Sequence, residues 1–304
     1  TPKWLECIFG IQDTVMGEIA SLITAICWAL TSIFFSTAGK QVGSLVVNRT
    51  RLVLAVIWLM LTHLALQGTI LPVHATMDHW LWLGLSGIIG LVIGDALLFQ
   101  AYVQIGPRIT TLIMAIVPVI SAVLAWGLLG ETLNLIEITG ICITVAGIAW
   151  VVSEKTSDAS NHDGHAHFTG ILYALGGAMG QAFGLVLSKR GLSDNFPSIS
   201  GVLIRMIVAM LVMWGITMLQ GQIGSTVKSI RNNMPAMKSI IAGSVVGPFI
   251  GVWLSLVAVQ LSPVGVASTL MALTPIMLLP FSHYVLKEKI SLLAVAVTIW
   301  AITG

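Results

Sequence analysis

Asp95 lies in the middle of an apolar stretch, Gly-Leu-Val-Ile-Gly-Asp-Ala-Leu-Leu-Phe-Gln-Ala-Tyr, which also contains Phe99 and Tyr102. Residues four and seven positions apart share one face of a helix, so the carboxylate would have two aromatic rings on its side. A carboxylate beside aromatic rings suits a small amine or organic cation. Because a charge in apolar surroundings is costly unless it is paired or hydrated, Asp95 predicts a binding or ion-coupling site.

Two arginines supply the opposite charge. Arg51 and Arg205 each stand near the start of a long apolar segment, at places that correspond when the two halves of the chain are compared. In a structural interpretation, Arg51 and Asp95 form a buried ion pair, or the arginines bind backbone carbonyls. In a functional interpretation, one arginine binds a substrate carboxylate, which together with Asp95 would select an amino acid or another zwitterion. An Asp95 without an arginine partner can instead carry a coupling proton.

Prolines, methionines and isolated polar or aromatic residues extend the candidate site. Pro118 and Pro275 lie inside apolar segments, where each removes one helical hydrogen bond and predicts a kink that can act as a gate. Met114 and Met271, one turn earlier, are flexible side chains suited to a cavity wall. The other candidates for substrate contact are polar or aromatic residues within apolar segments: Trp28, Gln181, Trp253 and Gln260.

The sequence offers no chemistry for an enzyme. It lacks a carboxylate pair, a Ser/His/Asp set, a glycine-rich phosphate loop and a His-Glu-x-x-His helix, so we expect neither catalysis nor a cofactor. The net charge of +2 is scattered, and no nucleic-acid partner is predicted. A polar stretch with metal-ligating side chains is better explained as a solvated linker, and we expect no metal site there. Its possible ligands are His162, Asp163, His165 and His167.

The elements that must position these residues are membrane-spanning helices. Of 304 residues, 57% are hydrophobic and 9% charged, and the mean hydropathy is +0.98. This leaves too little polar surface for a soluble globule. Lipid offers the backbone no hydrogen-bond partners, so each crossing needs a helix of about 20 apolar residues. Ten segments qualify: 18–37, 44–66, 80–101, 107–129, 133–152, 168–188, 198–220, 236–259, 264–286 and 290–304.

The chain contains an internal sequence repeat. A shift of 157 residues, from 90 to 247, superimposes matching glycines, methionines, prolines and glutamates of the two halves. Because each half has five spans, an odd number, we predict an all-α integral membrane protein of ten transmembrane helices in two inverted five-helix repeats. The predicted parts are a leader (1–16), a first repeat (17–152), a His-rich polar linker (153–167) and a second repeat (168–304) that lacks its natural C-terminus.

Three segments contain small residues at four-residue spacing. These ladders are Ser86-Gly90-Gly94, Gly176-Gly180-Gly184 and Gly243-Gly247-Gly251. Such spacing lets helix backbones approach closely, so we interpret the ladders as helix contacts. Glycine contacts that slide would also suit a protein whose halves move.

The motifs resemble those of a known family. The run from Gly94 to Leu133, with Ile-Val-Pro-Val and Leu-Leu-Gly-Glu-Thr-Leu, and its counterpart from Ser262 to Ile290 resemble the EamA-type members of the drug/metabolite transporter superfamily. The resemblance implies ten helices, alternating access, a cavity between the halves, and amino acids, other metabolites or toxic organic compounds as substrates. Glu131 and Glu288 resemble the family's acid at helix ends, where a capping or latching role is favoured.

These features predict a secondary active transporter, working as an exporter of small metabolites such as amino acids, amines or organic cations, with proton coupling through Asp95. A passive facilitator or channel, and a membrane scaffold or sensor without transport, are the alternatives. We expect a multi-pass protein of the plasma membrane, the inner membrane in a prokaryote, whose partners are substrate, lipid and protons and which is a monomer or homodimer. Lysines and arginines between the spans predict an outward N-terminus, whereas the resemblance implies a cytoplasmic one.

Overall fold

The computed structural model describes residues 3–132, 135, 138–139, 143 and 164–278. The described residues of the first repeat form α1 (Lys3–Val42), α2 (Ser44–Gln67), α3 (Met77–Gly87), the π-helical segment η1 (Ile88–Gly94), α4 (Asp95–Met114) and α5 (Val117–Leu129). Those of the second form α7 (Gly164–Gly191), α8 (Ser198–Leu219), α9 (Ile223–Arg231), α10 (Met234–Ser244), the π-helical η2 (Val245–Gly251), α11 (Val252–Leu261) and α12 (Val264–Met271). This part of the chain contains no strand.

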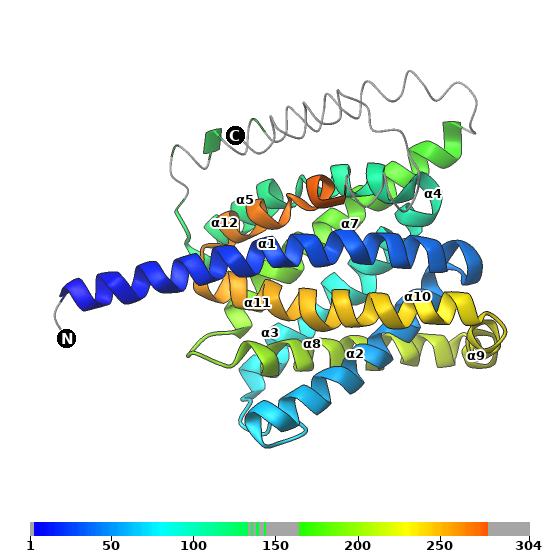
Figure 1. Ribbon diagram of the computed structural model, residues 1–304, viewed down its shortest axis with the longest axis horizontal. Coiled ribbons are helices and arrows are strands. Elements are labelled where there is room, and N and C mark those ends of the chain that lie inside the picture. Colours follow the sequence, from blue (N-terminus) through cyan, green and yellow to red (C-terminus); the bar gives the residue numbers. More distant parts are fainter. Residues whose placement is uncertain (1–2, 133–134, 136–137, 140–142, 144–163, 279–304) are drawn as a thin grey trace.

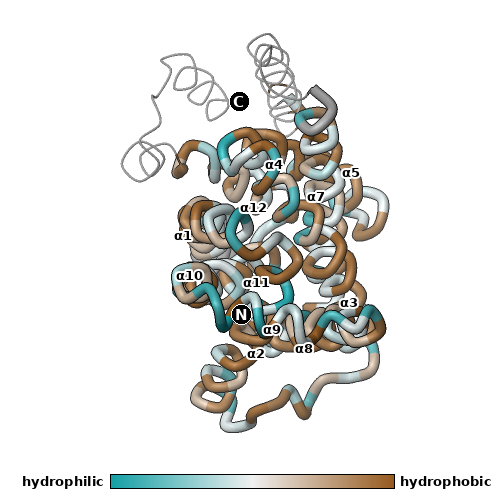
Figure 2. Tube along the Cα trace, turned by 90° about the vertical axis from the view of Figure 1, so that its right-hand side faces the viewer, coloured by the Kyte–Doolittle hydropathy of each residue, from teal (hydrophilic) through white to brown (hydrophobic). Residues whose placement is uncertain are grey.

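Six stretches of helix are long and apolar enough to cross a membrane. They are Val15–Val42, Ser44–Gln67, Met77–Met114, His167–Gly191, Ser198–Leu219 and Met234–Leu261, and two shorter apolar helices are Val117–Leu129 and Val264–Leu278. Large apolar side chains such as Trp126, Leu211 and Leu219 are exposed on the outside of the helices. Figure 2 shows apolar residues along most of the helical segments. An apolar exterior of this kind fits lipid rather than water.

The predicted spans agree with these helices, with a few differences. The stretch Met77–Met114 holds the predicted span 80–101 and the start of the predicted span 107–129, which continues in α5. The helix turns between the two spans, because Gly106 adopts φ 77° and ψ 164° and Pro107 follows it. Helix α1 begins at Lys3, so the predicted leader and the first span are one helix. The ten-helix prediction is confirmed only in part, because the fifth predicted span lies mostly, and the tenth wholly, outside the described residues.

The two repeats pack against each other in a swapped manner. Helix α1 packs on α10, η2 and α11, and its counterpart α7 packs on α3, η1 and α4. The paired helices α2 and α8, and likewise α5 and α12, contact each other. Matching helices run in opposite directions: in Figure 1, α1 runs from left to right and α7 from right to left. This arrangement agrees with the predicted inversion of the second repeat.

Glycines allow the closest of these contacts. A Cβ added to Gly180 would lie 2.5 Å from the Cα of Gly94, and one added to Gly94 would lie 3.1 Å from the Cα of Gly180. A Cβ on Gly247 would lie 2.6 Å from Oγ1 of Thr31 in α1. Two of the predicted ladders therefore face each other between α7 and η1, and the third lies against α1.

The two matched prolines do not kink continuous helices. Helix α4 ends at Met114 and α5 begins at Val117, so Pro118 lies in the first turn of α5. The same break follows α12, and the helix resumes one residue before Pro275. A missing N–H costs nothing in the first turn of a helix, because that N–H has no acceptor there. Each predicted kink is thus a full break between two helical pieces.

Candidate functional site

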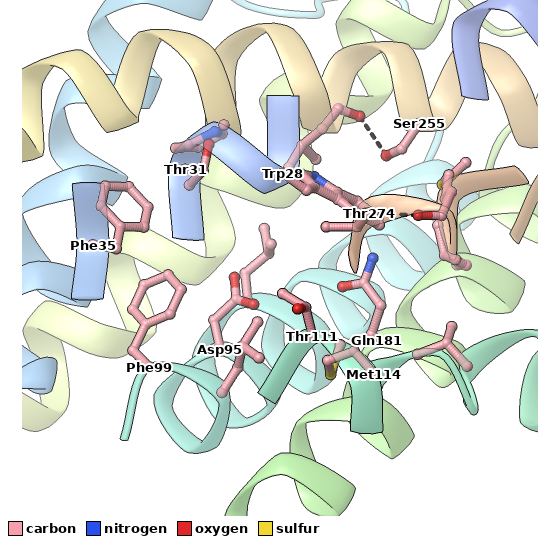
Figure 3. A pocket seen from close by; sticks show the side chains of 18 of the residues that line it. Trp28, Thr31, Phe35, Asp95, Phe99, Thr111, Met114, Gln181, Ser255 and Thr274 are labelled. Carbon is pink, nitrogen blue, oxygen red and sulfur yellow. Dashed lines mark hydrogen bonds between the residues drawn. The ribbon is translucent and has the colours of Figure 1, made fainter. Parts of the chain in front are cut away.

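A cavity lies between the two repeats, and both of them line it. In the first repeat, side chains from α1, α2 and the η1–α4 junction line it. In the second repeat, side chains from α7, α8 and the η2–α11 junction line it. The space between the atoms measures about 900 Å³ when its open part is included. This lies within the range of small-molecule sites. Figure 3 shows Asp95 between Phe99 and Thr111, with Trp28 beside the same space.

An ion pair between Arg51 and Asp95 occupies one side of the cavity. Nη2 of Arg51 lies 2.5 Å from Oδ2 of Asp95 and also donates to the carbonyl of Leu91 in η1, at 3.3 Å. Nε of Arg51 donates to Oδ1 of Asn48 at 2.8 Å. Both charged side chains are buried, and both belong to the cavity wall. The structure therefore contains the buried ion pair between Arg51 and Asp95 that the structural interpretation of the sequence predicted.

Arg205 has no acidic partner of this kind within the described ranges of the chain. Its side chain lines the cavity and is 3% exposed, yet Nε and Nη1 have no hydrogen-bond partner among the described residues. The residue that corresponds to Asp95 in the second repeat is Val252, which also lines the cavity. The Asp95 carboxylate attracts Arg205 through space without a hydrogen bond. The second repeat thus keeps the arginine and lacks the acid.

Aromatic rings form the wall beside the ion pair. The rings of Phe35 and Phe99 meet edge to face with centroids 5.0 Å apart, and those of Phe99 and Tyr102 stack with centroids 6.0 Å apart. The guanidinium carbon of Arg51 lies 4.9 Å from the centre of the Phe99 ring. Together the rings offer a flat apolar surface next to charged groups, as in sites that bind amphipathic organic molecules.

The structure brings most of the predicted residues together. The cavity wall contains Arg51 and Arg205 and, of the predicted substrate contacts, Trp28, Asp95, Phe99, Tyr102, Met114, Gln181 and Met271. Trp253 and Gln260 are not part of it, because Nε1 of Trp253 donates to Oγ of Ser198 and Nε2 of Gln260 donates to the Phe196 carbonyl. Pro118 and Pro275 are next to the wall residues Val117 and Thr274.

Small hydroxyl residues of the wall were missed by the sequence analysis. The hydroxyls of Thr31 and Ser255 donate to carbonyls of their own helices, and that of Thr274 donates to the Met271 carbonyl across the break after α12, so each of these polar side chains in the cavity wall has a backbone acceptor. Thr31 and Phe35 follow Trp28 at helical spacing, and this spacing would have identified both. Ser255 and Thr274 carry no comparable signal.

A cluster at one end of the cavity joins the repeats. Nζ of Lys189 lies 2.6 Å from Oε1 of Glu131 and donates to the carbonyl of Ser262, at 2.9 Å. The N–H of Val264 donates to Oε2 of Glu131, at 3.0 Å. Glu131 follows α5 of the first repeat, whereas Lys189 and Val264 belong to the second. We call these four residues the Glu131 latch; its counterpart Glu288 lies outside the described residues.

No metal site is found in the part of the chain that the structure describes. No three His, Cys, Asp or Glu side chains come together there. Positions 153–163 of the predicted linker, with His162 and Asp163, lie outside the described residues.

Comparisons with known proteins agree with this architecture. The model of the EamA-like transporter family matches residues 15–153 and again residues 168–304. A protein of known crystal structure shares the fold with a TM-score of 0.66 and 17% sequence identity, over 96% of this chain and 95% of that one. A comparison with curated proteins finds no match. The two family matches divide the chain where its internal repeat does, and the chain therefore belongs to the EamA-like transporter family.

Proposed function

We propose that the protein is a secondary active transporter that works by alternating access and exports small metabolites, among them amino acids, amines or organic cations, across the plasma membrane. The observation that carries this proposal is the cavity that residues of both repeats line. A site at the interface of two inverted repeats can face either side of the membrane when one repeat rocks against the other around it.

The contacts between the repeats suit such a motion. The wall helices are broken before Pro118 and before Pro275, so short pieces can tilt without bending a continuous helix. The contact of Gly94 with Gly180 has no interlocking side chains. Within the Glu131 latch, one ion pair and one hydrogen bond join the two repeats, which is a small barrier to separation.

Proton coupling through Asp95 is part of the proposal. Because Asp95 is paired with Arg51, it takes up a proton only in a state in which the pair has opened. Opening of the pair would link protonation to the relative position of α2 and α4. The coupling test is given with the predictions for single residues below.

Counterflow in proteoliposomes tests the transport proposal. Vesicles with the purified full chain are loaded with an unlabelled amino acid or amine, and uptake of the labelled compound is followed; a transient overshoot above equilibrium is expected. Trp28→Ala, in the cavity wall, should reduce the overshoot, whereas Trp126→Ala, on the outer surface, should leave it unchanged. Equilibration without overshoot would support the facilitator instead, and the absence of any uptake or binding would support a scaffold. Faster release of preloaded substrate from expressing cells checks the direction of transport.

A further inference from the structure

The charges of the cavity wall do not cancel. Among the described residues of the wall, the acidic and basic side chains are Arg51, Asp95 and Arg205. Asp95 neutralises Arg51 in a direct ion pair, so one positive charge remains. An amine or organic cation would find Asp95 already bound to a guanidinium and would meet a net positive wall.

The remaining charge belongs to Arg205. Its guanidinium is buried, and two of its three nitrogens have no hydrogen-bond partner in the described part of the chain. Such donors are rare inside proteins, because a buried group that loses water without gaining a partner is destabilising. The comparison of the repeats shows where the partner is missing, since Val252 stands in the place that Asp95 occupies in the first repeat.

Glycines make a place for the guanidinium at the edge of the cavity. A Cβ on Gly90 or on Gly184 would lie 3.4 Å from Nη2 of Arg205, so this nitrogen packs closely against the crossing of η1 and α7, where larger residues would crowd it. Phe35, Phe99 and Tyr102 supply an apolar surface in the same cavity. A ligand that satisfies this site has one anionic oxygen group and an apolar or aromatic body.

We propose that Arg205 binds the carboxylate of the transported substrate. In the second repeat, this carboxylate takes the place of the acid that the first repeat supplies as Asp95. The inference rests on the proposed transport function and narrows its substrate class to small carboxylates, with or without an amine. Amines and organic cations that lack a carboxylate, which the proposed function includes, are excluded by it. A guanidinium donates two parallel hydrogen bonds to a carboxylate, which gives both attraction and orientation.

Four compounds with the same ring test this proposal against the detergent-purified full chain. Phenylacetate, phenylalanine, phenylacetamide and phenethylamine differ in charge but present the same apolar body, and their dissociation constants are measured by thermal shift and calorimetry. Phenylacetate and phenylalanine should bind more tightly than the amide and the amine. Arg205→Gln should raise their dissociation constants by about 10- to 100-fold, the range for hydrogen bonds to a charged group. Arg231→Gln, which removes an exposed arginine of α9, should leave them unchanged.

A second variant covers the case in which Arg205→Gln does not fold. Val252→Asp keeps the arginine and places an acid where the first repeat has one, so it should also weaken carboxylate binding at least as much as it weakens binding of the amide. Equal affinity of the wild type and both variants for phenylacetate, or preferential binding of phenethylamine, would overturn the inference and leave the transporter proposal standing. Carboxylates that bind through Arg205 but show no counterflow would confirm the anion site and overturn the transport function. Equal stabilisation by chloride and by phenylacetate would show an inorganic anion at Arg205 and overturn the substrate assignment.

Discussion

Two arginines at corresponding places have different surroundings, and this difference defines the chemistry of single residues in the cavity. Arg51 is bound by Asp95, Asn48 and a carbonyl of η1, whereas Arg205 has no hydrogen-bonding acid among the described residues. Burial of an ion pair is costly, but removal of one partner is costlier because it leaves the other charge alone. The Arg51–Asp95 pair therefore stabilises the packing of α2 against α4 only as long as both members are present.

Removal of Asp95 alone should destabilise the protein more than removal of the pair. Asp95→Asn leaves the two buried arginines of the cavity wall without a carboxylate and should lower the free energy of unfolding by about 3 kcal/mol. The double variant Asp95→Asn/Arg51→Gln should recover part of this loss, since Arg205 is then the charged residue that remains among the described residues of the wall. Unfolding titrations in mixed micelles measure the cycle, with Arg231→Gln as the control on the surface. Additive effects of the two substitutions would show that the pair contributes no coupling energy.

Asp95→Asn also tests proton coupling. An asparagine cannot change its charge, so vesicles with this variant should lose accumulation driven by a proton gradient while they keep exchange of labelled for unlabelled substrate. Uptake with and without an imposed gradient measures the two activities in the same preparation. Accumulation at the wild-type level would remove Asp95 from the coupling mechanism and leave it as the ion-pair partner of Arg51.

At the scale of the elements, the hydrophobic pattern predicted the membrane-spanning helices but few of the features that shape the cavity. Long apolar runs must be helices in lipid, so the predicted spans that lie within the described residues correspond to helices, and the turn before Pro107 agrees with the structure. The π-helical segments η1 and η2 were not predicted, because the hydrophobic pattern of an apolar run does not distinguish an α-helix from a π-helix. The short helix α9 was missed as well, since its nine residues look like a polar connection. Trp253 and Gln260 were assigned to the cavity because their residue types suit ligands, but their polar groups bind the backbone or side chains of neighbouring segments.

The contact between α7 and η1 depends on the absence of side chains. Gly180→Ala would place a Cβ 2.5 Å from the Cα of Gly94, so the helices must separate, and we expect a loss of about 1–3 kcal/mol in the free energy of unfolding. Gly215→Ala in α8 is the matched control, because no atom lies within 4 Å of its added Cβ and alanine is the better helix former. Thermal unfolding in one detergent compares the two. A Gly180→Ala protein as stable as Gly215→Ala would show that the backbones do not need this close approach.

For the whole molecule, the inverted repeat gives the helices of one half counterparts in the other, whereas single residues such as Asp95 and Val252 differ between the halves. The Glu131 latch is located at the end of the molecule where α5 ends and α12 begins, on the left in Figure 1. Its ion pair joins the first repeat to the second through Glu131 and Lys189. A protein that alternates between two faces must release such a contact in one of its states.

Loss of the latch should open this end of the cavity more often. In a cysteine-free background with Ser268→Cys, a wall position, both Glu131→Gln and Lys189→Gln should raise the rate of labelling by a membrane-impermeant maleimide applied from the latched side. The increase should be about two- to fivefold, since a partly exposed ion pair contributes up to about 1 kcal/mol. Arg190→Gln is the neighbouring control, because its guanidinium stacks on Trp82 and takes no part in the latch. In the proposed alternating-access cycle the latch belongs to one of two states, so its removal should at the same time slow labelling from the opposite side. An unchanged rate on both sides would mean that Glu131 only caps α12 through the N–H of Val264.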